Sequence, residues 1–396
     1  MQEKGKAAVL TARIMGHHVR DRLSRSTRTA RVGEVPTSPS ALTPAWLTAA
    51  LCTDHPGAEV TSVKELGGSD GTSSRRSLVV AYNEAGQEAG LPTHLFTKST
   101  TTLTTRIVCG LCHLLANESG FYNRIRPELD MSAPHGYHAV YHERSFRSLF
   151  IMEDVAATRG ATFGSPVDRV LDRAQAEDMV SQLAVYHGRF WDSPRLTDDF
   201  TWLLTASTWH TKMNNMINTA RMFRNGIPRA ESVIPTELLA RRDELWPALF
   251  RSVELHARSP QTLVHADVHA GNWFVTGEGR MGLYDWQCTV RGNWALDFAY
   301  ALMSGLDIES RRAWEHDLLR LYLDELKSNG GKAPDFDEAW LHYRQQVFHG
   351  LFAWVGTIGA GRMQPEMQPR DICLANIERI TQAVVDLESL DALDES

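Results

Sequence analysis

The chain has 396 residues, 43% hydrophobic and 22% charged, which is the composition of an ordinary globular protein with room for two domains. Its formal net charge of −7 argues against a general nucleic-acid-binding protein. No apolar run reaches the ~18 residues of a membrane span, and the five scattered cysteines do not suit a disulfide framework. We therefore expect a cytoplasmic protein with no nucleic-acid partner and no membrane span.

The first 32 residues form a basic arm, in which eight lysines and arginines stand against Glu3 and Asp21. The segment VGEVPTSPSALTP follows and has the composition of a linker. We predict that residues 1–40 are an extension and a linker. The sequence assigns the arm no role.

Short runs rich in β-branched residues predict an antiparallel sheet within residues 41–155. A short helix at 44–57 comes first, and the strand candidates, separated by turns, are 59–66, 77–84, 93–99, 137–143 and 148–154. An apolar stretch at 102–126 predicts a helix between the third and fourth strands. Its Cys109 and Cys112 form a lone CxxC, which we interpret as buried structural thiols rather than a zinc or redox site.

Residues 156–396 are predicted to be mainly helical. Apolar residues recur at helical spacing in 173–191, 201–223 and 235–257, and again from about 294 onward. A strand-like island at 261–287 interrupts them. We predict an α+β protein with two lobes, a small N-terminal antiparallel-sheet lobe and a larger helical C-terminal lobe.

Glycines and hydroxyl side chains fill the predicted turn between the first two strands. The segment GGSDG contains Gly67, Gly68, Ser69 and Gly71. Glycine lets backbone N–H groups approach phosphate oxygens without a Cβ in the way. No GKS or GKT follows, so the segment is not a Walker A loop. A phosphate-binding loop and an ordinary turn both fit this composition.

Lys98 stands at the end of the third predicted strand, in FTKS. A strand lysine can meet phosphate as a compact charge, but it needs a carboxylate to hold it in place. Glu118, in the following predicted helix, can supply one. A solvent-facing lysine and a surface glutamate are the alternatives.

The segment HADVHAGNWF contains Asp267, followed five residues later by Asn272, and Asp285 comes eighteen residues after Asp267. One carboxylate can accept a proton from an attacking hydroxyl, and an asparagine with a second carboxylate suits magnesium held on nucleotide phosphates. The H-x-D-x-x-x-x-N spacing, with a later Asp closing a hairpin, is that of protein-kinase catalytic loops.

A metal-dependent hydrolase is an alternative for the same segment. His265, Asp267 and His269 alternate, and on a strand they would share a face as metal ligands must. That interpretation leaves Asn272 and Asp285 without a role. A purely structural turn is the remaining alternative.

Together these residues resemble the aminoglycoside phosphotransferase and choline-kinase-like superfamily of small-molecule kinases, which has a protein-kinase-like fold. Within it the chain is most similar to the ecdysteroid-kinase-like branch. The similarity runs from about residue 60 to about 310. It rests on LVHADVHAGNWFVTGEGRMGLYDWQCTVRGNWALDFAYAL, ESGFY, SLFIMEDV and LAVYHGRFW.

The resemblance implies a role for each matching residue. Asp267 would be the catalytic base, Asn272 and Asp285 the magnesium ligands, and Lys98 a phosphate contact oriented by Glu118. The resemblance further implies that the glycine segment contacts the phosphates, through Gly67, Gly68, Ser69 and Gly71. It implies a hinge that meets adenine, formed by Met152, Glu153 and Val155. It also implies that His265 and Asp297 brace the catalytic loop. Ala266 stands where the family usually has glycine.

The implied function is ATP- and Mg²⁺-dependent transfer of the γ-phosphate to a hydroxyl of a small molecule. A non-catalytic nucleotide-binding protein on a kinase-like fold is the alternative. The short distance from DWQ to GNWALDFAY leaves no room for the activation segment of a protein kinase. Aromatic residues and methionines of the helical half could line an apolar acceptor pocket, or they could simply form the core.

Overall fold

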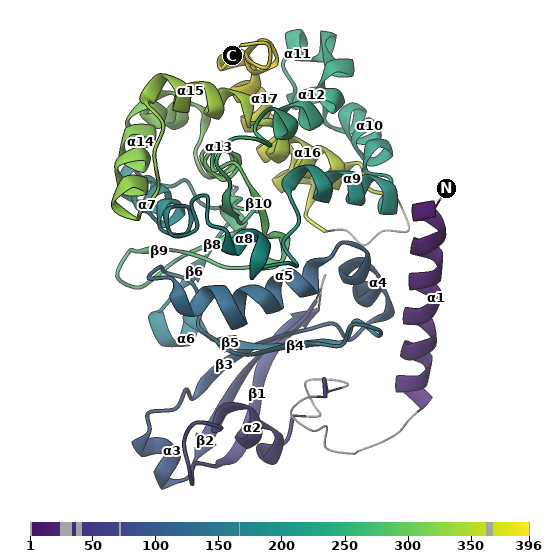
Figure 1. Cartoon of the computed structure of the whole chain (residues 1–396), viewed down its shortest axis with the longest axis vertical. Coiled ribbons are helices and arrows are strands. Elements are labelled where there is room, and N and C mark those ends of the chain that lie inside the picture. Colours follow the sequence, from purple (N-terminus) through teal and green to yellow (C-terminus); the bar gives the residue numbers. More distant parts are fainter. Residues whose placement is uncertain are drawn as a thin grey trace. The chain divides into compact units, whose positions relative to one another are not determined.

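The computed structural model describes residues 2–23, 34–36, 42–70, 73–165, 167–361 and 367–395. It forms two compact units, one of Met1–Glu128 and Pro134–Ala161, the other of Leu129–Ala133 and Thr162–Ser396. The first holds an antiparallel sheet and the second is mainly helical, which confirms the predicted α+β class (Figure 1). Among the helices described, none is both long enough and apolar enough to cross a membrane.

The first unit is built on a five-stranded antiparallel sheet, and all five predicted strands are confirmed. Its strand order is β1-β2-β3-β5-β4, so β3 lies at the centre. The bounds are β1 (Val60–Asp70), β2 (Ser74–Tyr82), β3 (His94–Ser99), β4 (Gly136–Tyr141) and β5 (Ser148–Glu153). Alternate residues of the central strands, such as Leu78, Leu95 and Ile151, bury one face of the sheet together with Trp46 of α2 (Pro44–Leu51).

The glycine segment is not the turn that the sequence predicts. β1 continues through Gly67 and Gly68 and pairs with β2 as far as Asp70 opposite Ser74. The register shifts between Glu65 and Gly67, which marks a bulge. A Cβ on Gly68 would lie 1.9 Å from the carbonyl oxygen of Arg75, so close strand packing requires this glycine. The predicted site residue Gly71 lies outside the described residues.

Helices follow the third strand, as predicted, but not as one continuous helix. α4 (Leu103–Leu111) and α5 (Leu114–Gly120) are separated at His113, whose φ of 64° is left-handed, and α5 runs into the π-helical turn η2 (Phe121–Ile125) and the 3-10 turn η3 (Arg126–Glu128). Cys109 is buried in α4, and Cys112 is buried at the end of that helix. The unit also contains α1 (Gln2–Leu23), α3 (Glu84–Glu88) and α6 (Val155–Arg159).

The second unit surrounds a helix that is buried along its whole length, α13 (Ala295–Gly305). Helices α7 (Arg173–Arg189), α14 (Ile308–Ser328), α15 (Phe336–Gln345), α16 (Phe348–Ile358) and α17 (Arg370–Asp386) pack against it. Other helical elements of this unit are α8 (Arg195–Asp198), α9 (Ala206–Ile217), α10 (Thr219–Ala230), η4 (Glu231–Val233), α11 (Thr236–Ala240), α12 (Arg242–Leu255) and α18 (Ser389–Ala392).

Two small sheets form the predicted strand-like island of this unit. One joins β6 (Thr162–Phe163), β8 (Trp273–Val275) and β9 (Met281–Leu283), and the other pairs β7 (Thr262–Val264) with β10 (Val290–Gly292). The short helical turns η5 (Ala270–Asn272) and η6 (Trp286–Cys288) begin or end beside these strands.

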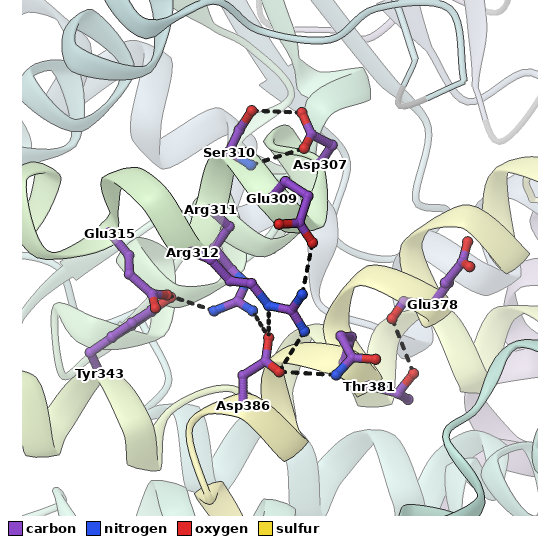
Figure 2. Close-up of polar contacts among 11 residues, drawn as sticks. Asp307, Glu309, Ser310, Arg311, Arg312, Glu315, Tyr343, Glu378, Thr381 and Asp386 are labelled. Carbon is purple, nitrogen blue, oxygen red and sulfur yellow. Dashed lines mark hydrogen bonds and ion pairs between the residues drawn. The ribbon is translucent and has the colours of Figure 1, made fainter.

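An ion-pair network ties three of the outer helices together (Figure 2). Arg311 of α14, with a side chain only 1% exposed, binds Asp386 of α17 and donates to Glu315 at 2.7 Å. Glu315 also accepts from the Tyr343 hydroxyl of α15 at 2.8 Å, and Arg312 donates to Asp386 at 2.8 Å. Each buried charge has an opposite charge beside it, as burial demands.

Candidate active site

Lys98 and Glu118 form a buried ion pair in the first unit. Side chains alternate along β3, so Lys98 stands on the face opposite to Leu95 and away from the α2 core. Its Nζ lies 2.9 Å from each carboxylate oxygen of Glu118 on α5. The side chains are 8% and 2% exposed. The structure therefore brings together the lysine and glutamate that the sequence singled out.

The predicted hinge, from Met152 to Val155, is the end of β5 and the start of α6. The Glu153 N–H donates to the His135 carbonyl at 2.8 Å, and its carboxylate accepts from Arg159 Nε at 2.8 Å. Burial raises the pKa of Glu153, but hydrogen bonds from Arg159 and its neighbours outweigh burial and lower it. The Glu153 N–H is thus already bonded. Val155 begins α6, where backbone N–H groups have no acceptor within the helix.

Asp267 and Asn272 lie close together in the second unit, in the loop between β7 and β8. Asn272 Nδ2 donates to Asp267 Oδ2 at 3.1 Å and to the Asp267 carbonyl oxygen at 2.8 Å. The Asp267 side chain is 23% exposed, whereas Asn272 is buried. The two residues that the sequence places five apart are thus joined by two hydrogen bonds, and the amide nitrogen of Asn272 points toward the aspartate.

Asp297, wholly buried in the first turn of α13, binds the backbone of this loop. Its Oδ2 accepts from the His265 N–H at 2.7 Å and its Oδ1 from the Ala266 N–H at 2.8 Å. The Tyr186 hydroxyl donates to Oδ2 at 2.6 Å, and His187 Nε2 lies 3.4 Å from it. Burial raises the pKa of Asp297, but these hydrogen bonds and the nearby histidines bring it below its usual value. The predicted bracing role of Asp297 is confirmed.

His265 connects the loop to the neighbouring hairpin. Its Nδ1 accepts from the Asp267 N–H at 3.1 Å, so its Nε2 carries the hydrogen and donates to the Tyr284 carbonyl at 3.0 Å. Burial lowers its pKa, which agrees with a neutral ring. Tyr284 in turn donates its N–H to the Asn272 carbonyl at 3.1 Å. Asp285, the next residue, is therefore held next to the loop by the β8–β9 hairpin.

This geometry contradicts the metal-hydrolase alternative. β7 ends at Val264, so His265, Asp267 and His269 do not alternate along a strand. Both ring nitrogens of His265 are bonded to backbone, and His269 Nδ1 accepts from the Gly271 N–H at 3.0 Å. Within the described part of the chain, no three His, Cys, Asp or Glu side chains are grouped to hold a metal ion.

Two histidines that the sequence did not single out support the same loop. His349 Nε2 of α16 donates to the Ala266 carbonyl at 2.7 Å, so its Nδ1 accepts from His210 Nε2 of α9 at 3.0 Å. Both rings are buried, and burial lowers both pKa values. Ala266 has a left-handed φ of 61°, a conformation that costs a non-glycine residue roughly 1–2 kcal/mol. Asp297 binds the N–H of Ala266 and His349 binds its C=O, so both backbone groups of this residue are fixed.

No signal in the sequence points to His210 or His349. They are 139 residues apart, in segments whose apolar spacing predicts only core helices. The contact depends on how α9 and α16 pack.

Comparison with protein families identifies the chain as a member of the phosphotransferase enzyme family, whose model matches residues 114–337. That stretch is more than half of the chain and contains Glu118, Asp267, Asn272 and Asp285, while Lys98 precedes it. The chain therefore belongs to a family of phosphotransferases. The predicted superfamily is confirmed at this level. A search of curated proteins finds no match.

Several solved structures are similar at low sequence identity. A microcompartment-associated aminopropanol kinase is 14% identical, with 86% of this chain and 96% of that chain covered and a TM-score of 0.48. A choline kinase from Streptococcus pneumoniae is 13% identical, with 83% and 94% covered and a TM-score of 0.43. An ADP-bound aminoglycoside phosphotransferase is 13% identical, with 83% and 94% covered and a TM-score of 0.41. These likenesses are too distant to indicate a substrate.

Proposed function

We propose that the protein is a small-molecule kinase, which uses ATP and Mg²⁺ to transfer the γ-phosphate to a hydroxyl group of its substrate. The observation that carries this proposal is the loop of Asp267 and Asn272, bonded to each other and fixed to α13 by the carboxylate of Asp297. A preorganised carboxylate is what a general base needs. Membership of a phosphotransferase family supports the reaction class.

In the proposed reaction Asp267 is the catalytic base. The acceptor oxygen forms a bond to the γ-phosphorus while the bond from that phosphorus to the bridging oxygen breaks, and ADP leaves. The hydroxyl proton passes to the Asp267 carboxylate. Lys98, held by Glu118, would contact the ATP phosphates as a fixed positive charge.

The residues present fit a magnesium ion. Asn272 directs its amide nitrogen at Asp267, so its Oδ1 would be the atom that holds the ion, and Asp285 would supply a carboxylate. Mg²⁺ prefers oxygen ligands and is usually held by one or two carboxylates together with substrate phosphates. When bound, the ion would neutralise phosphate charge.

The nucleotide contacts are proposed from the glycine segment and the hinge. Gly67, Gly68 and Ser69 in β1, with Gly71 after it, would lie along the phosphates, although strand packing already explains Gly68. In the hinge we favour the Val155 N–H over the bonded Glu153 N–H, with Met152 buried beside them. We accordingly propose residues 41–155 as the nucleotide-binding lobe and 156–396 as the catalytic and acceptor lobe.

The acceptor is proposed only as a class. The DWQ segment and the ESGFY helix resemble the ecdysteroid-kinase-like branch, which supports a small hydroxylated molecule as the acceptor. An apolar acceptor would follow if aromatic residues and methionines of the helical half lined the acceptor pocket. A cytoplasmic location fits the five cysteines, which are too few and too scattered in the sequence for a disulfide framework. Turnover restricted to polar amino-sugars would contradict the apolar acceptor.

Thermal stability with and without ATP and Mg²⁺ tests the nucleotide site, with Asp285→Ala as its partner variant. A ligand at about 100 times its Kd stabilises by roughly 2.7 kcal/mol, which is a measurable shift. We expect a magnesium-dependent gain that Asp285→Ala abolishes. No gain at millimolar ATP would contradict the proposal.

ADP release across a panel of alcohols then tests catalysis. We expect Asp267→Asn to retain ATP binding and to lose about 10²–10⁴-fold in kcat, the usual contribution of a general base. Nucleotide binding without turnover on any alcohol would instead support the non-catalytic alternative.

A further inference from the structure

The N-terminal helix α1 has one face that packs into the first unit. Ile14 is 0% and His18 8% exposed, and Asp21 has a side chain 18% exposed. These residues are spaced four and three apart, so they lie on one side of a helix. Burial and the neighbouring Arg106 lower the pKa of His18, which agrees with an uncharged ring against α4. The face is therefore a packing surface that ends in one carboxylate.

That carboxylate binds a buried arginine of α4. Asp21 Oδ2 lies 2.6 Å from Arg106 Nη1, and the Arg106 side chain is only 2% exposed. Among the described residues, Asp21 is the carboxylate that bonds this guanidinium. Burial of an arginine without a counter-charge is unfavourable by several kcal/mol in general terms. The Asp21 carboxylate therefore offsets the cost of burying Arg106 in the docked structure.

Arg106 also connects α4 to the residue that follows β3, the strand that carries Lys98. Its Nε donates to the Thr100 carbonyl at 3.3 Å. Thr100 lies two residues after Lys98 of β3, and α4 leads through His113 into α5, which carries Glu118. One guanidinium thus connects α1, the end of β3 and the start of α4.

A second arginine extends the contact to the sheet. Asp21 Oδ1 lies 3.4 Å from Nη1 of Arg147, which is in the turn between β4 and β5. The ring of His142 in that turn lies 6.0 Å from the ring of His17 of α1, measured between centroids. Asp21 consequently bridges α4 and the β4–β5 turn. Both lie next to β3, where the Lys98–Glu118 pair is held.

We propose that α1 is a clamp that sets the geometry of the Lys98–Glu118 pair, with Asp21 and Arg106 as positioning residues. This inference rests on the proposed function, in which Lys98 contacts ATP. The arm is then part of the nucleotide-binding apparatus rather than a passive extension. Removal of α1, or capture of it by another molecule, would lower the affinity for ATP without touching the nucleotide.

Asp21→Asn tests the clamp in the full-length protein. We expect KM for ATP to rise by about fivefold or more, in the usual range of coupling between sites, while KM for the acceptor stays unchanged. Asp21→Glu keeps the charge and should recover most of the affinity. Arg20→Ala, at an exposed position of the same helix, is the matched control and should behave as wild type.

A double-mutant cycle with Glu118→Gln separates positioning from general destabilisation. If Asp21 acts through Glu118, Asp21→Asn should raise KM for ATP much less in the Glu118→Gln background than in wild type. Equal effects in both backgrounds would overturn the proposal.

Amide hydrogen exchange in the absence of nucleotide gives a readout that does not depend on activity. We expect faster exchange across residues 103–120 in Asp21→Asn than in Arg20→Ala. Unchanged exchange across residues 103–120 would contradict the proposed role of α1, even if the protein proves to be a kinase. Faster exchange in a protein that does not bind ATP would instead leave α1 docked as inferred and remove the proposed function.

Discussion

Two polar networks of the second unit differ in what their side chains bind. In the first network, side chains bind the backbone of one loop. The Asp297 carboxylate accepts from the N–H groups of His265 and Ala266, and the His349 ring donates to the Ala266 carbonyl. Around Arg311, charged side chains bind one another across α14, α15 and α17 (Figure 2).

The two networks therefore stabilise different features, one the conformation of a loop and the other the packing of helices. Hydrogen bonds to consecutive backbone groups determine the conformation of a peptide, and here that peptide precedes Asp267. Ion pairs between helices determine how rigid elements pack, and those helices carry none of the proposed catalytic residues. We therefore expect changes in the first network to affect catalysis and changes in the second to affect stability.

The largest expected contrast is between Asp297→Asn and Asp386→Asn. An asparagine at 297 cannot accept from both backbone N–H groups and the tyrosine hydroxyl, so the loop should shift, and we expect kcat to fall by about 100-fold or more. An asparagine at 386 leaves Arg311 under-compensated and should cost about 3 kcal/mol of stability. Kinetics well below Tm, together with urea unfolding, measure both.

The contrast fails if Asp386→Asn, assayed while fully folded, loses as much activity as Asp297→Asn. That result would mean that the helix packing also sets the loop.

A smaller effect is expected from His349→Phe. Without its donor the Ala266 carbonyl loses a buried hydrogen bond worth about 1–3 kcal/mol, and we expect kcat to fall about tenfold with KM for ATP unchanged. His349→Gln keeps a donor and should recover part of the loss. His342→Phe is the matched control, since it removes a partly buried histidine of α15 that does not contact the loop.

Acid should weaken the two networks at different pH values. Burial lowers the pKa of His210 and His349 from 6.5, so the unfolded chain binds more protons and stability is lost as pH falls below about 6.5. Burial raises the pKa of Asp386, but hydrogen bonds from Arg312 and its neighbours bring it below 3.8, so its contribution is lost only in stronger acid.

Urea unfolding between pH 7 and 5 measures the first loss. Each histidine that protonates only on unfolding contributes up to about 1.4 kcal/mol per pH unit. His349→Phe should flatten this dependence and Asp386→Asn should not. Equal slopes in the wild type and His349→Phe would contradict the argument.

The smallest effect is expected from Ala266→Gly. Glycine adopts the left-handed φ of 61° without a Cβ penalty but gains entropy in the unfolded chain, so the net gain should be about 0.5–1 kcal/mol. Activity should be unchanged, because both backbone hydrogen bonds remain. A loss of stability would show that packing of the Ala266 methyl group outweighs its backbone strain.

Much of the fold was predictable because its signals are local. β-branched runs located all five strands of the sheet, and the H-x-D-x-x-x-x-N spacing located Asp267 and Asn272, which the structure joins by hydrogen bonds. The prediction of a turn at the glycine segment was wrong because the same composition suits a turn and a bulged strand. Only the pairing of Gly68 with Arg76, which brings Gly68 close to the Arg75 carbonyl, decides between them.

By itself the sequence determined the α+β class and singled out Lys98, Glu118 and the loop of Asp267 as candidates, since periodicity and short spacings lie within one or two elements. The structure decided that Lys98 and Glu118 pair. Only the tertiary structure decided that His210 and His349 support Ala266, and that Asp21 meets Arg106, 85 residues away. Such contacts depend on how separate helices pack, and a single polar residue on a helix carries no mark of the partner that packing will bring to it.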